Sequence, residues 1–468
     1  MCDGTLAQCL CKKYFLKEFF IMKTRKILAL ILAVLMAVGC LAACGGETKT
    51  NTNTNSANVE GGSEKLVPFS DEFIAEWGQY IAEKEGTEIN LTLWAPSKAM
   101  EVFQAEANKF ADMFKDYFNV TITVAAQEEG DAAAQVILAP DKAADVFSFP
   151  SDQLNKLIDA QAINNVDMFA EDIKAMNTAS SVEAATVDGS IYAYPEVGDN
   201  SYFLCYDKRF VTDEQAKSLE TLLAACKDAG KKFTFDSGNG YFTCVYLYTG
   251  GLQTLGLEED GITQKFNDYN IDEVVATTKA FAELFAQYKG TFENIGTVGF
   301  ADGVKTDPTT VAAGVIGSWD IASVKEILGD NAGFAILPTI NVGGTDKQMI
   351  NMFGYKFLGV NKNSVAPYTA QLLAFYLSGE ECQLDRAEKL EWGPSNVNVQ
   401  NSDFVQNNVS MKAILAQAEY SMPQVGIANT FWDPLAGLGK YVAEPTNDFS
   451  DAKVKEQVEA CIANIKDE

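Results

Sequence analysis

The sequence predicts an α/β protein whose body is divided into two lobes, each with a mainly parallel β-sheet flanked by helices. Strand-like and helix-like segments alternate along the chain, which is the pattern of a parallel sheet with crossover helices. The body is roughly 400 residues long, more than one hydrophobic core usually supports. No linker-like stretch cuts it in half. We therefore expect a hinge of several chain crossings, with a cleft between the lobes.

The first part of the body supplies a strand–helix–strand unit. Residues Ile89–Pro96 alternate apolar and polar side chains as a strand does, and residues 100–118 repeat their apolar positions at helical spacing. Val120–Ala126 returns to the strand pattern. Ala144–Pro150 is a further buried strand, and residues 152–163 are a further helix. This order predicts parallel strands.

The same alternation resumes in the second part of the body. Three more strands are predicted, at residues 231–236, 313–320 and 331–338. A later strand at residues 353–361 precedes a helix at residues 366–378. The repeated order supports a second sheet of the same kind.

Composition excludes several classes of function. The 468 residues include 36 Lys and Arg against 64 Asp and Glu, a net charge of −28. Nucleic-acid binding needs clustered cations, so we expect none. The chain has no His, which excludes His-based catalytic triads and His-containing zinc sites.

The ten cysteines show no C-x-x-C spacing, so we expect no metal site built from sulfur. Five of them lie in the body, and we interpret these as small buried hydrophobic residues: Cys205, Cys226, Cys244, Cys382 and Cys461. A bridge between Cys205 and Cys244 is the alternative.

The N-terminal region has the pattern of a signal peptide. After Met22, three basic residues precede an apolar run from Ile27 to Val38, 12 residues long and short for a membrane span. The sequence LAAC, ending at Cys44, resembles the lipobox of bacterial lipoproteins, which implies cleavage before Cys44 and lipidation of it. Cys40 fits less well because AVG precedes it. The alternative is a plain transmembrane anchor.

We expect translation to begin at Met22, with residues 1–43 as upstream residues and signal peptide. Residues 44–63 would form the lipidated cysteine and a tether, because Gly45–Gly62 is a polar stretch without aromatic residues. Residues 1–44 hold six Lys and Arg and two Asp and Glu, so the remainder carries 30 against 62, a net charge of −32. The sequence thus predicts an acidic body attached to a membrane by its N-terminus.

Four stretches, in this order, resemble the extracellular solute-binding proteins of carbohydrate ABC transporters, above all the maltose/maltodextrin-binding group: Tyr192–Lys208, Phe235–Gly251, Gly317–Pro338 and Asn429–Gly439. The likeness runs from Ile89 to the C-terminus. It implies a two-lobed periplasmic-binding-protein fold, with one lobe formed by residues 64–197 and 339–395 and the other by residues 198–338 and 396–468.

Sugar binding needs aromatic platforms for the apolar faces of the sugar rings and planar polar groups for the hydroxyls. Trp319 ends an apolar strand at the carboxyl edge of a predicted parallel sheet. Trp432 stands where the family places a stacking aromatic, beside Asp433 and Pro434. The alternative for both is packing between the lobes. Trp77 and Trp392 are expected to be structural, and Trp94, which ends the first strand, fits a place in the core as well as one at the site.

The resemblance also implies polar contacts from the first lobe. Ser97 and Lys98 lie in the loop after the first strand, where the family often contacts sugar. Asp152 matches a family aspartate that binds sugar hydroxyls, although an aspartate there could instead cap a helix. Phe149 stands at the position of a family aromatic.

Further candidate residues follow from the same resemblance. Asp199 and Asn200 mark the first crossing between lobes and are expected to face the cleft, and Tyr241 and Phe242 match aromatics that line the sugar site. Asn239 replaces a glutamate of the maltose-binding pattern, and an amide is a weaker acceptor than a carboxylate. This departure leaves the identity of the sugar open.

The predicted function is therefore that of a lipid-anchored sugar-binding protein on the outer face of the membrane of a Gram-positive bacterium. It would be a monomer without cofactor that delivers oligosaccharide to the permease subunits of an ABC importer. The alternatives are a glycoside-acting enzyme, because an acid pair has no sequence signature, and a carbohydrate-binding scaffold. We find no nucleotide-binding loop and no repeats of the kind that scaffolds carry.

The lipobox generates a first prediction. Cys44→Ser should release the protein from cells in soluble form, because the lipid is expected on this sulfur. Fractionation of cells into membrane and medium measures the effect, with Cys40→Ser as the control that stays attached. Retention of Cys44→Ser on the membrane would contradict the lipoprotein assignment, and release of Cys40→Ser alone would move the site to Cys40.

Overall fold

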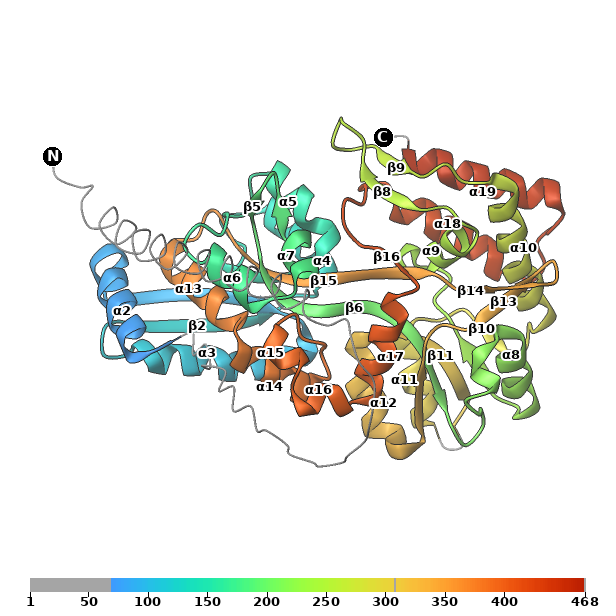
Figure 1. The fold of residues 1–468 in the computed structure, drawn as a ribbon, viewed down its shortest axis with the longest axis horizontal. Coiled ribbons are helices and arrows are strands. Elements are labelled where there is room, and N and C mark those ends of the chain that lie inside the picture. Colours follow the sequence, from blue (N-terminus) through green and yellow to red (C-terminus); the bar gives the residue numbers. More distant parts are fainter. Residues whose placement is uncertain (1–68, 307–308, 467–468) are drawn as a thin grey trace, which may run out of the picture. The chain divides into compact units, whose positions relative to one another are not determined.

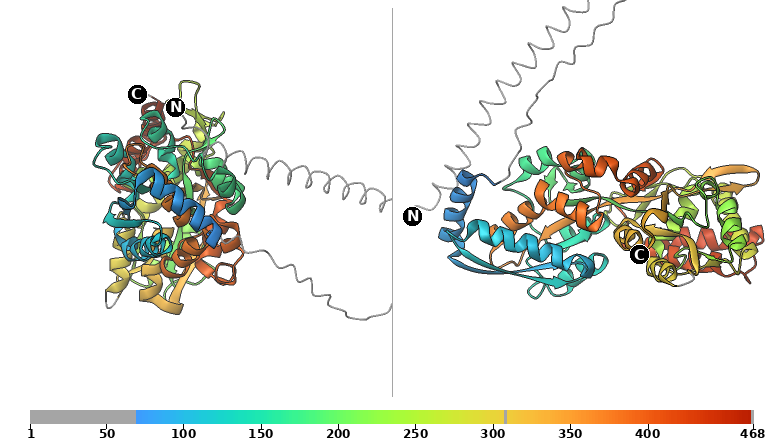
Figure 2. Two further views of the ribbon diagram at one scale, coloured as in Figure 1. Left: turned by 90° about the vertical axis from the view of Figure 1, so that its left-hand side faces the viewer. Right: turned by 90° about the horizontal axis from the view of Figure 1, so that it is seen from below.

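A sheet of ten strands runs through the described part of the chain, which in this computed structural model is residues 69–306 and 309–466, without the side chains of 297 and 298. The main path of the sheet is β10–β7–β11–β6–β15–β3–β1–β2, while β12 pairs with β6 and β16 pairs with β15 (Figure 1). Helices lie on both faces of the sheet (Figure 2). The predicted α/β class is confirmed.

One half of the sheet contains three parallel strands. β1 pairs in parallel with β2 on one side and with β3 on the other. The strand predicted from the alternating pattern of residues 89–96 is therefore present, and every second side chain along it is buried. The strands and main helices of this half are β1 (Glu88–Ala95), β2 (Asn119–Ala126), β3 (Val146–Pro150), α2 (Asp71–Glu85), α3 (Met100–Phe114), α4 (Glu129–Leu138), α5 (Leu154–Asp159) and α13 (Pro367–Leu377).

The helix predicted over residues 152–163 is shorter than expected. A 3-10 turn at Ser151–Gln153 comes first, and α5 then covers only Leu154–Asp159. It ends early because Gln161 takes a positive φ of 52°, which an α-helix cannot continue through.

The other half repeats the arrangement. β7 pairs in parallel with β10 and with β11. Its strands and helices are β7 (Lys232–Thr234), β10 (Phe292–Glu293), β11 (Val311–Gly317), β12 (Ala332–Ala335), α8 (Leu219–Asp228), α9 (Gly240–Thr249), α10 (Ile271–Gln287), α11 (Thr297–Lys305), α12 (Ile321–Leu328), α17 (Val409–Ala418), α18 (Trp432–Ala443) and α19 (Asp451–Lys466).

Two long strands join the halves. β6 (Tyr194–Asp207) pairs antiparallel with β15 (Asn351–Val360) as far as Ser201, and from Tyr202 onward it pairs antiparallel with β11. β15 pairs on its other edge with β3. The chain therefore crosses between the halves inside continuous strands, as the absence of a linker predicts.

Short elements complete the described chain: α6 (Ala170–Met176), α7 (Ala179–Ala184), β4 (Thr186–Val187), β5 (Ser190–Ile191), β8 (Thr254–Leu257), β9 (Gln264–Phe266), β13 (Thr339–Val342), β14 (Thr345–Gln348), α14 (Glu380–Leu390), α15 (Val397–Gln400), α16 (Asp403–Asn407) and β16 (Ser421–Pro423). β8 with β9, β13 with β14 and β4 with β5 each form a two-stranded antiparallel sheet.

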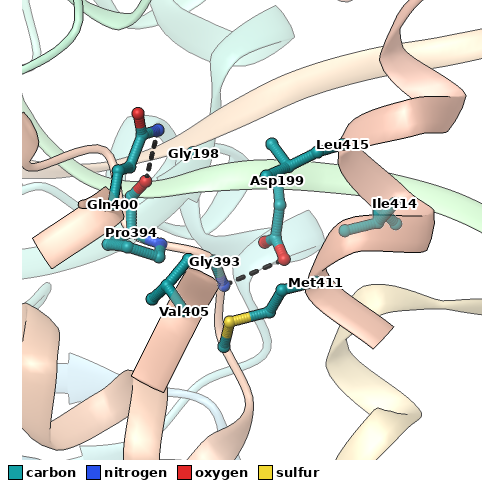
Figure 3. Close-up of a pocket in the computed structure, with 9 residues that line it drawn as sticks. All are labelled: Gly198, Asp199, Gly393, Pro394, Gln400, Val405, Met411, Ile414 and Leu415. Atoms are coloured by element: carbon teal, nitrogen blue, oxygen red, sulfur yellow. Dashed lines mark hydrogen bonds between the residues drawn. The ribbon is translucent and has the colours of Figure 1, made fainter. Parts of the chain in front are cut away.

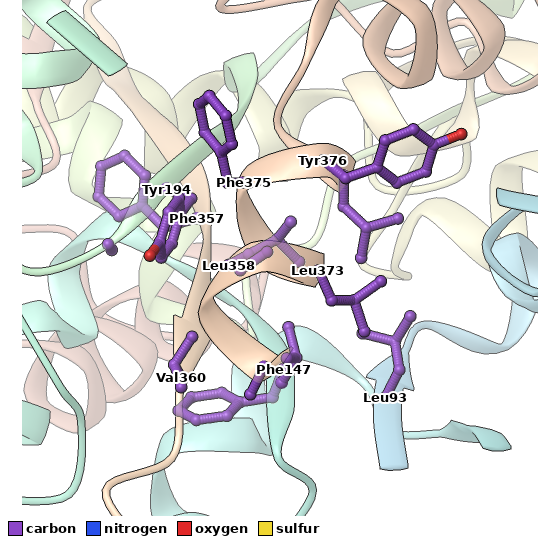
Figure 4. Packing of buried hydrophobic residues seen from close by; sticks show 14 of the residues in the cluster. Leu93, Phe147, Tyr194, Phe357, Leu358, Val360, Leu373, Phe375 and Tyr376 are labelled. Carbon is purple, nitrogen blue, oxygen red and sulfur yellow. The ribbon is translucent and has the colours of Figure 1, made fainter. Parts of the chain in front are cut away.

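The buried side chains form two large cores. One draws on residues 69–197 and 357–392, and Figure 4 shows part of it, with side chains of β1, β3 and β15 gathered around α13. The other draws on residues 202–352 and 427–465. Ile340 and Val342 of β13 pack in this second core, although residues 339–395 were assigned to the first lobe from the sequence. β13 lies in the second core because it packs against α8 and α10.

The five cysteines of the body are buried free thiols. The interpretation as small buried hydrophobic residues is confirmed, and the alternative bridge between Cys205 and Cys244 does not form. Along residues 69–306 and 309–466, no helix is long and apolar enough to cross a membrane. The signal peptide, Cys44 and the tether lie outside the described residues.

A buried network of charged side chains surrounds the crossing strands. Arg386 of α14 binds Glu106 of α3 through two nitrogens, at 2.8 and 3.1 Å, and lies 3.6 Å from Glu196 of β6. The Ser148 hydroxyl lies 2.6 Å from Glu196 and 3.1 Å from Glu129, and Lys356 of β15 binds Glu129 at 2.5 Å. The three carboxyl groups share two cations.

Burial raises the pKa of both Glu106 and Glu196 in this network. The pKa of Glu196 rises to about 7, because burial raises it more than the nearby cations lower it. A carboxyl with a raised folded pKa stabilises the fold at low pH, and this contribution is lost as the pH rises through the folded pKa.

We predict that Glu196→Gln weakens the pH dependence of stability. Between pH 5 and pH 8 the wild type should lose about 1–3 kcal/mol through this group, and the glutamine variant should not, because an amide does not ionise. Urea unfolding at both pH values measures the difference. Glu419→Gln changes an exposed carboxyl and serves as the control. Equal profiles for Glu196→Gln and wild type would contradict the assignment.

Candidate ligand-binding site

The candidate site residues follow the carboxyl ends of four strands. Ser97 and Lys98 follow β1, and Asp152 follows β3. Tyr241 lies in the first turn of α9, after β7, and Trp319 lies in the 3-10 turn Ser318–Asp320, directly after β11. β1 and β3 are parallel, as are β7 and β11, so each pair ends at a common edge. Such edges are where α/β proteins bind ligands.

Trp319 and Trp432 both lie beside Tyr241, and we call these three side chains the aromatic group. The centroid of the Tyr241 ring lies 6.1 Å from that of Trp319 and 6.2 Å from that of Trp432. All three keep part of their surface exposed. Phe242 lies beside Trp319, at 6.5 Å, but is only 4% exposed. The structure thus brings four of the predicted aromatics together and leaves three of them accessible.

Two glycines make this arrangement possible. A Cβ atom at Gly240 would lie 2.2 Å from the carbonyl oxygen of Trp432, so α9 and α18 can begin side by side only without a side chain there. A Cβ at Gly317 would lie 2.2 Å from the Trp319 ring. Glycine at both positions therefore sets where the aromatic rings lie.

A chain of hydrogen bonds connects the aromatic group with Asp152. Gln424 donates from Nε2 to Asp152 Oδ1 at 2.7 Å, and its Oε1 accepts from Asn200 Nδ2 at 2.9 Å. The Tyr241 hydroxyl donates to the Asn200 carbonyl at 3.2 Å. Asp152 does not cap α5, which begins after Gln153 without a side-chain cap. The alternative role considered for Asp152 is thus not the one observed.

Two lysines, Lys98 after β1 and Lys356 of β15, reach the turn that carries Trp319. Lys98 Nζ lies 2.6 Å from Asp320 Oδ1, and the Asp320 side chain is 2% exposed. Lys356 Nζ lies 5.5 Å from the ring centroid of Trp319 and 5.0 Å from that of Trp392. The ammonium group of Lys98 therefore balances the buried charge of Asp320.

The remaining candidates lie outside this arrangement. The Phe149 side chain is fully buried in the first core, between Phe147 and Phe357, so it presents no surface to a ligand in this conformation. Ser97 donates from its hydroxyl to Glu128 at 2.7 Å. Asn239 is exposed and caps α9 by accepting from the Tyr241 amide at 3.0 Å.

Asp199 is buried and turned toward the segment after α14. The Gly393 amide donates to Asp199 Oδ2 at 2.9 Å, beside a small cavity that is also lined by α17 (Figure 3). Its neighbour Asn200 is buried as well and belongs to the hydrogen-bond chain described above. The two residues of the predicted crossing therefore have different surroundings.

Burial shifts the titration of the site's carboxyl groups. It raises the pKa of Asp152 to about 7, although the hydrogen bond from Gln424 acts in the opposite direction. It raises the pKa of Asp199 to about 6. Burial also raises the pKa of Tyr241 well above its ordinary value, so its hydroxyl keeps the proton that it donates to Asn200.

Sequence reasoning missed Gln424, Asp320 and Lys356. Gln424 follows a short strand without a recognisable motif, and Lys356 lies in an apolar strand where a charge looks like an exception. The adjacency of Asp320 to Trp319 was the one available signal.

A family model described as bacterial extracellular solute-binding protein matches residues 109–413. A search of curated proteins finds no match.

Many solved structures share the fold. One, determined with acarbose, is 28% identical, with a TM-score of 0.72 over 81% of this chain and 98% of that chain. A maltodextrin-binding protein from L. casei BL23 without ligand is 23% identical, with a TM-score of 0.68 over 81% and 99%. The maltose-maltodextrin-binding protein of Alicyclobacillus acidocaldarius is 18% identical, with a TM-score of 0.66 over 81% and 100%. These likenesses confirm the two-lobed periplasmic-binding-protein fold.

The partial exposure of the aromatic group generates a prediction of stability. Trp432→Ala and Trp319→Ala should each lower the free energy of unfolding by about 1–2 kcal/mol, because truncation leaves a smaller cavity at a partly open site. Trp392→Ala, at a 6% exposed side chain, should cost about 3–5 kcal/mol. Urea unfolding of the three variants tests this. Equal losses would mean that the two tryptophans serve as core.

Proposed function

The chain belongs to the family of bacterial extracellular solute-binding proteins, and we propose that it binds oligosaccharide, a maltodextrin above all, between the two halves of its sheet. The observation that carries this proposal is the aromatic group, in which Tyr241 and Trp319 follow β7 and β11 and Trp432 begins α18, connected by hydrogen bonds to Asp152 after β3. The likeness to a structure solved with acarbose supports it.

The chemistry of the residues suits a sugar. Trp432 and Trp319 offer partly exposed rings to the apolar faces of sugar rings. Asp152 offers carboxylate oxygens, and the exposed Lys98 and Asn239 offer an ammonium group and an amide to the hydroxyls. Ser97 can contribute its hydroxyl through the loop it shares with Lys98. Asp199, Asn200, Phe242 and Phe149 are buried, and we assign them to the support of these groups.

The proposed mechanism is closure of two lobes on the sugar. We place the lobe boundaries near the crossing strands, with residues 69–197 and 357–395 in one lobe and residues 198–352 and 396–466 in the other, because the two cores divide there. A sugar that contacts both lobes would stabilise the closed form. The family and its neighbours are binding proteins, and we assign no catalytic step.

We further propose that the closed form delivers its sugar to the permease subunits of an ABC importer. The protein would act as a monomer held at the outer face of the membrane by lipid on Cys44, in a Gram-positive bacterium. The lipobox and the polar stretch Gly45–Gly62 support this arrangement.

Binding of maltotriose to the purified protein tests the function. Titration calorimetry and tryptophan fluorescence should both detect binding, with cellotriose as the control sugar. Trp432→Ala should weaken maltotriose binding roughly tenfold to a hundredfold, since stacking on an aromatic ring is worth about 1–3 kcal/mol by analogy with nucleic-acid bases. Trp319→Ala should behave alike, and Trp77→Ala should not.

Two results would contradict the proposal. One is the absence of binding by maltose, maltotriose and longer maltodextrins. The other is the release of shorter products when these sugars are incubated with the protein, which would make it an enzyme. Chromatography of the incubation mixture detects such products.

A further inference from the structure

Gln424 is held on four sides at the point where the two halves of the sheet meet. Its side chain is nearly inaccessible, at 3% exposure. Its backbone N–H donates to the Phe353 carbonyl at 2.8 Å, and its backbone carbonyl accepts from the Ser151 hydroxyl at 2.7 Å. Its side chain accepts from Asn200 at 2.9 Å and donates to Asp152 at 2.7 Å.

The orientation of the Gln424 amide follows from its two partners. Asn200 offers Nδ2, a donor, so the oxygen of Gln424 must face it. The NH2 group then faces the Asp152 carboxyl, which accepts. A reversed amide would oppose two donors on one side and two acceptors on the other.

Strand β15 leaves room for this side chain at one position. A Cβ atom at Gly354 would lie 2.3 Å from Gln424 Oε1. The backbone of Gly354 does not have a positive φ, so the requirement for glycine there is steric. Gly354 thus serves the placement of Gln424.

The loop after Gln424 continues to the aromatic group. Gln264 of β9, 1% exposed, accepts from the Ala428 amide at 2.9 Å and fixes the middle of this loop. The loop then leads into α18 at Trp432. One short segment therefore carries both a hydrogen bond to Asp152 and an aromatic ring.

We propose that Gln424 is a positioning residue of the ligand site, which turns the Asp152 carboxyl toward the sugar and ties it to β6 through Asn200. This inference rests on the proposed function in so far as Asp152 contacts the sugar. Gln424 itself is buried and acts through Asp152.

The electrostatics of Asp152 provide a measurable consequence. The groups that face its carboxyl are Lys156 on α5, Tyr241 on α9 and Gln424. The hydrogen bond from Gln424 favours the ionised carboxyl. Loss of this donor should therefore raise the pKa of Asp152.

The test compares Gln424→Met with Gln417→Met. Gln417 is also a buried amide, accepting from the Leu337 amide at 2.7 Å and donating to Asn351 at 3.2 Å. Both variants lose a buried amide, so both should lose stability. Only Gln424→Met should raise the pKa of Asp152 and weaken maltotriose binding, by about tenfold.

Two readouts keep the inference separate from the proposed function. Carboxyl ¹³C NMR of aspartate-labelled protein without sugar follows the titration of Asp152, whose signal is identified by its loss in Asp152→Asn. Calorimetry measures the affinity for maltotriose. Gln424→Glu, which retains an acceptor for Asn200, replaces the methionine variant if that one does not fold, and should raise the pKa of Asp152 through like-charge repulsion.

The outcomes decide between the two proposals. An unchanged pKa of Asp152 in Gln424→Met overturns the positioning role, whether or not sugar binds. A raised pKa with unchanged maltotriose affinity also overturns it. If the wild type binds none of the sugars, the proposed function fails, and the NMR titration alone then decides whether Gln424 positions Asp152.

Discussion

The pairing of β6 with β15 is the contact on which the rest of the structure depends. β6 lies against β15 until Ser201 and against β11 from Tyr202, so one strand belongs to both cores. All fourteen of its residues are buried. Asn200 stands one residue before the changeover, and the hydrogen bonds between Asp152 and Tyr241 pass through it. A shift of register in β6 would displace Asn200 and therefore separate Asp152 from the aromatic group.

The charged network beside these strands has a related effect. Arg386 and its partners bring together α3, α14 and β6, and Lys356 joins β15 to α4. Buried ion pairs contribute little net stability, but removal of one partner is costly. Such a network therefore selects one arrangement of these elements over others. In this protein three helices, α3, α4 and α14, share the network, so the crossing strands are held by all three and not by a single helix.

The sequence was sufficient for the fold and for part of the site, for physical reasons that differ. Alternation within β1 and helical spacing within α3 are local patterns, and so the predicted strand–helix–strand unit is confirmed. Trp319 could be placed at a strand end for the same reason, whereas Tyr241 was implied only by the family resemblance. The bond between Gln424 and Asp152 joins residues 272 positions apart, and that between Lys98 and Asp320 joins residues 222 apart. No local pattern reports such contacts. The burial of Phe149 is likewise decided by β15, which pairs with β3.

The close start of α9 and α18, which Gly240 permits, has an electrostatic consequence. α9 begins at Gly240, α18 begins at Trp432, and α12 begins two residues after Trp319, so three helices start at the aromatic group. The first turn of a helix presents unpaired N–H groups and a partial positive charge. Asp433 and Asp320, which is also paired with Lys98, lie in this field, and it favours their negative charge. This contribution comes from the backbone, so neither a change of pH nor the replacement of a side chain on these turns removes it.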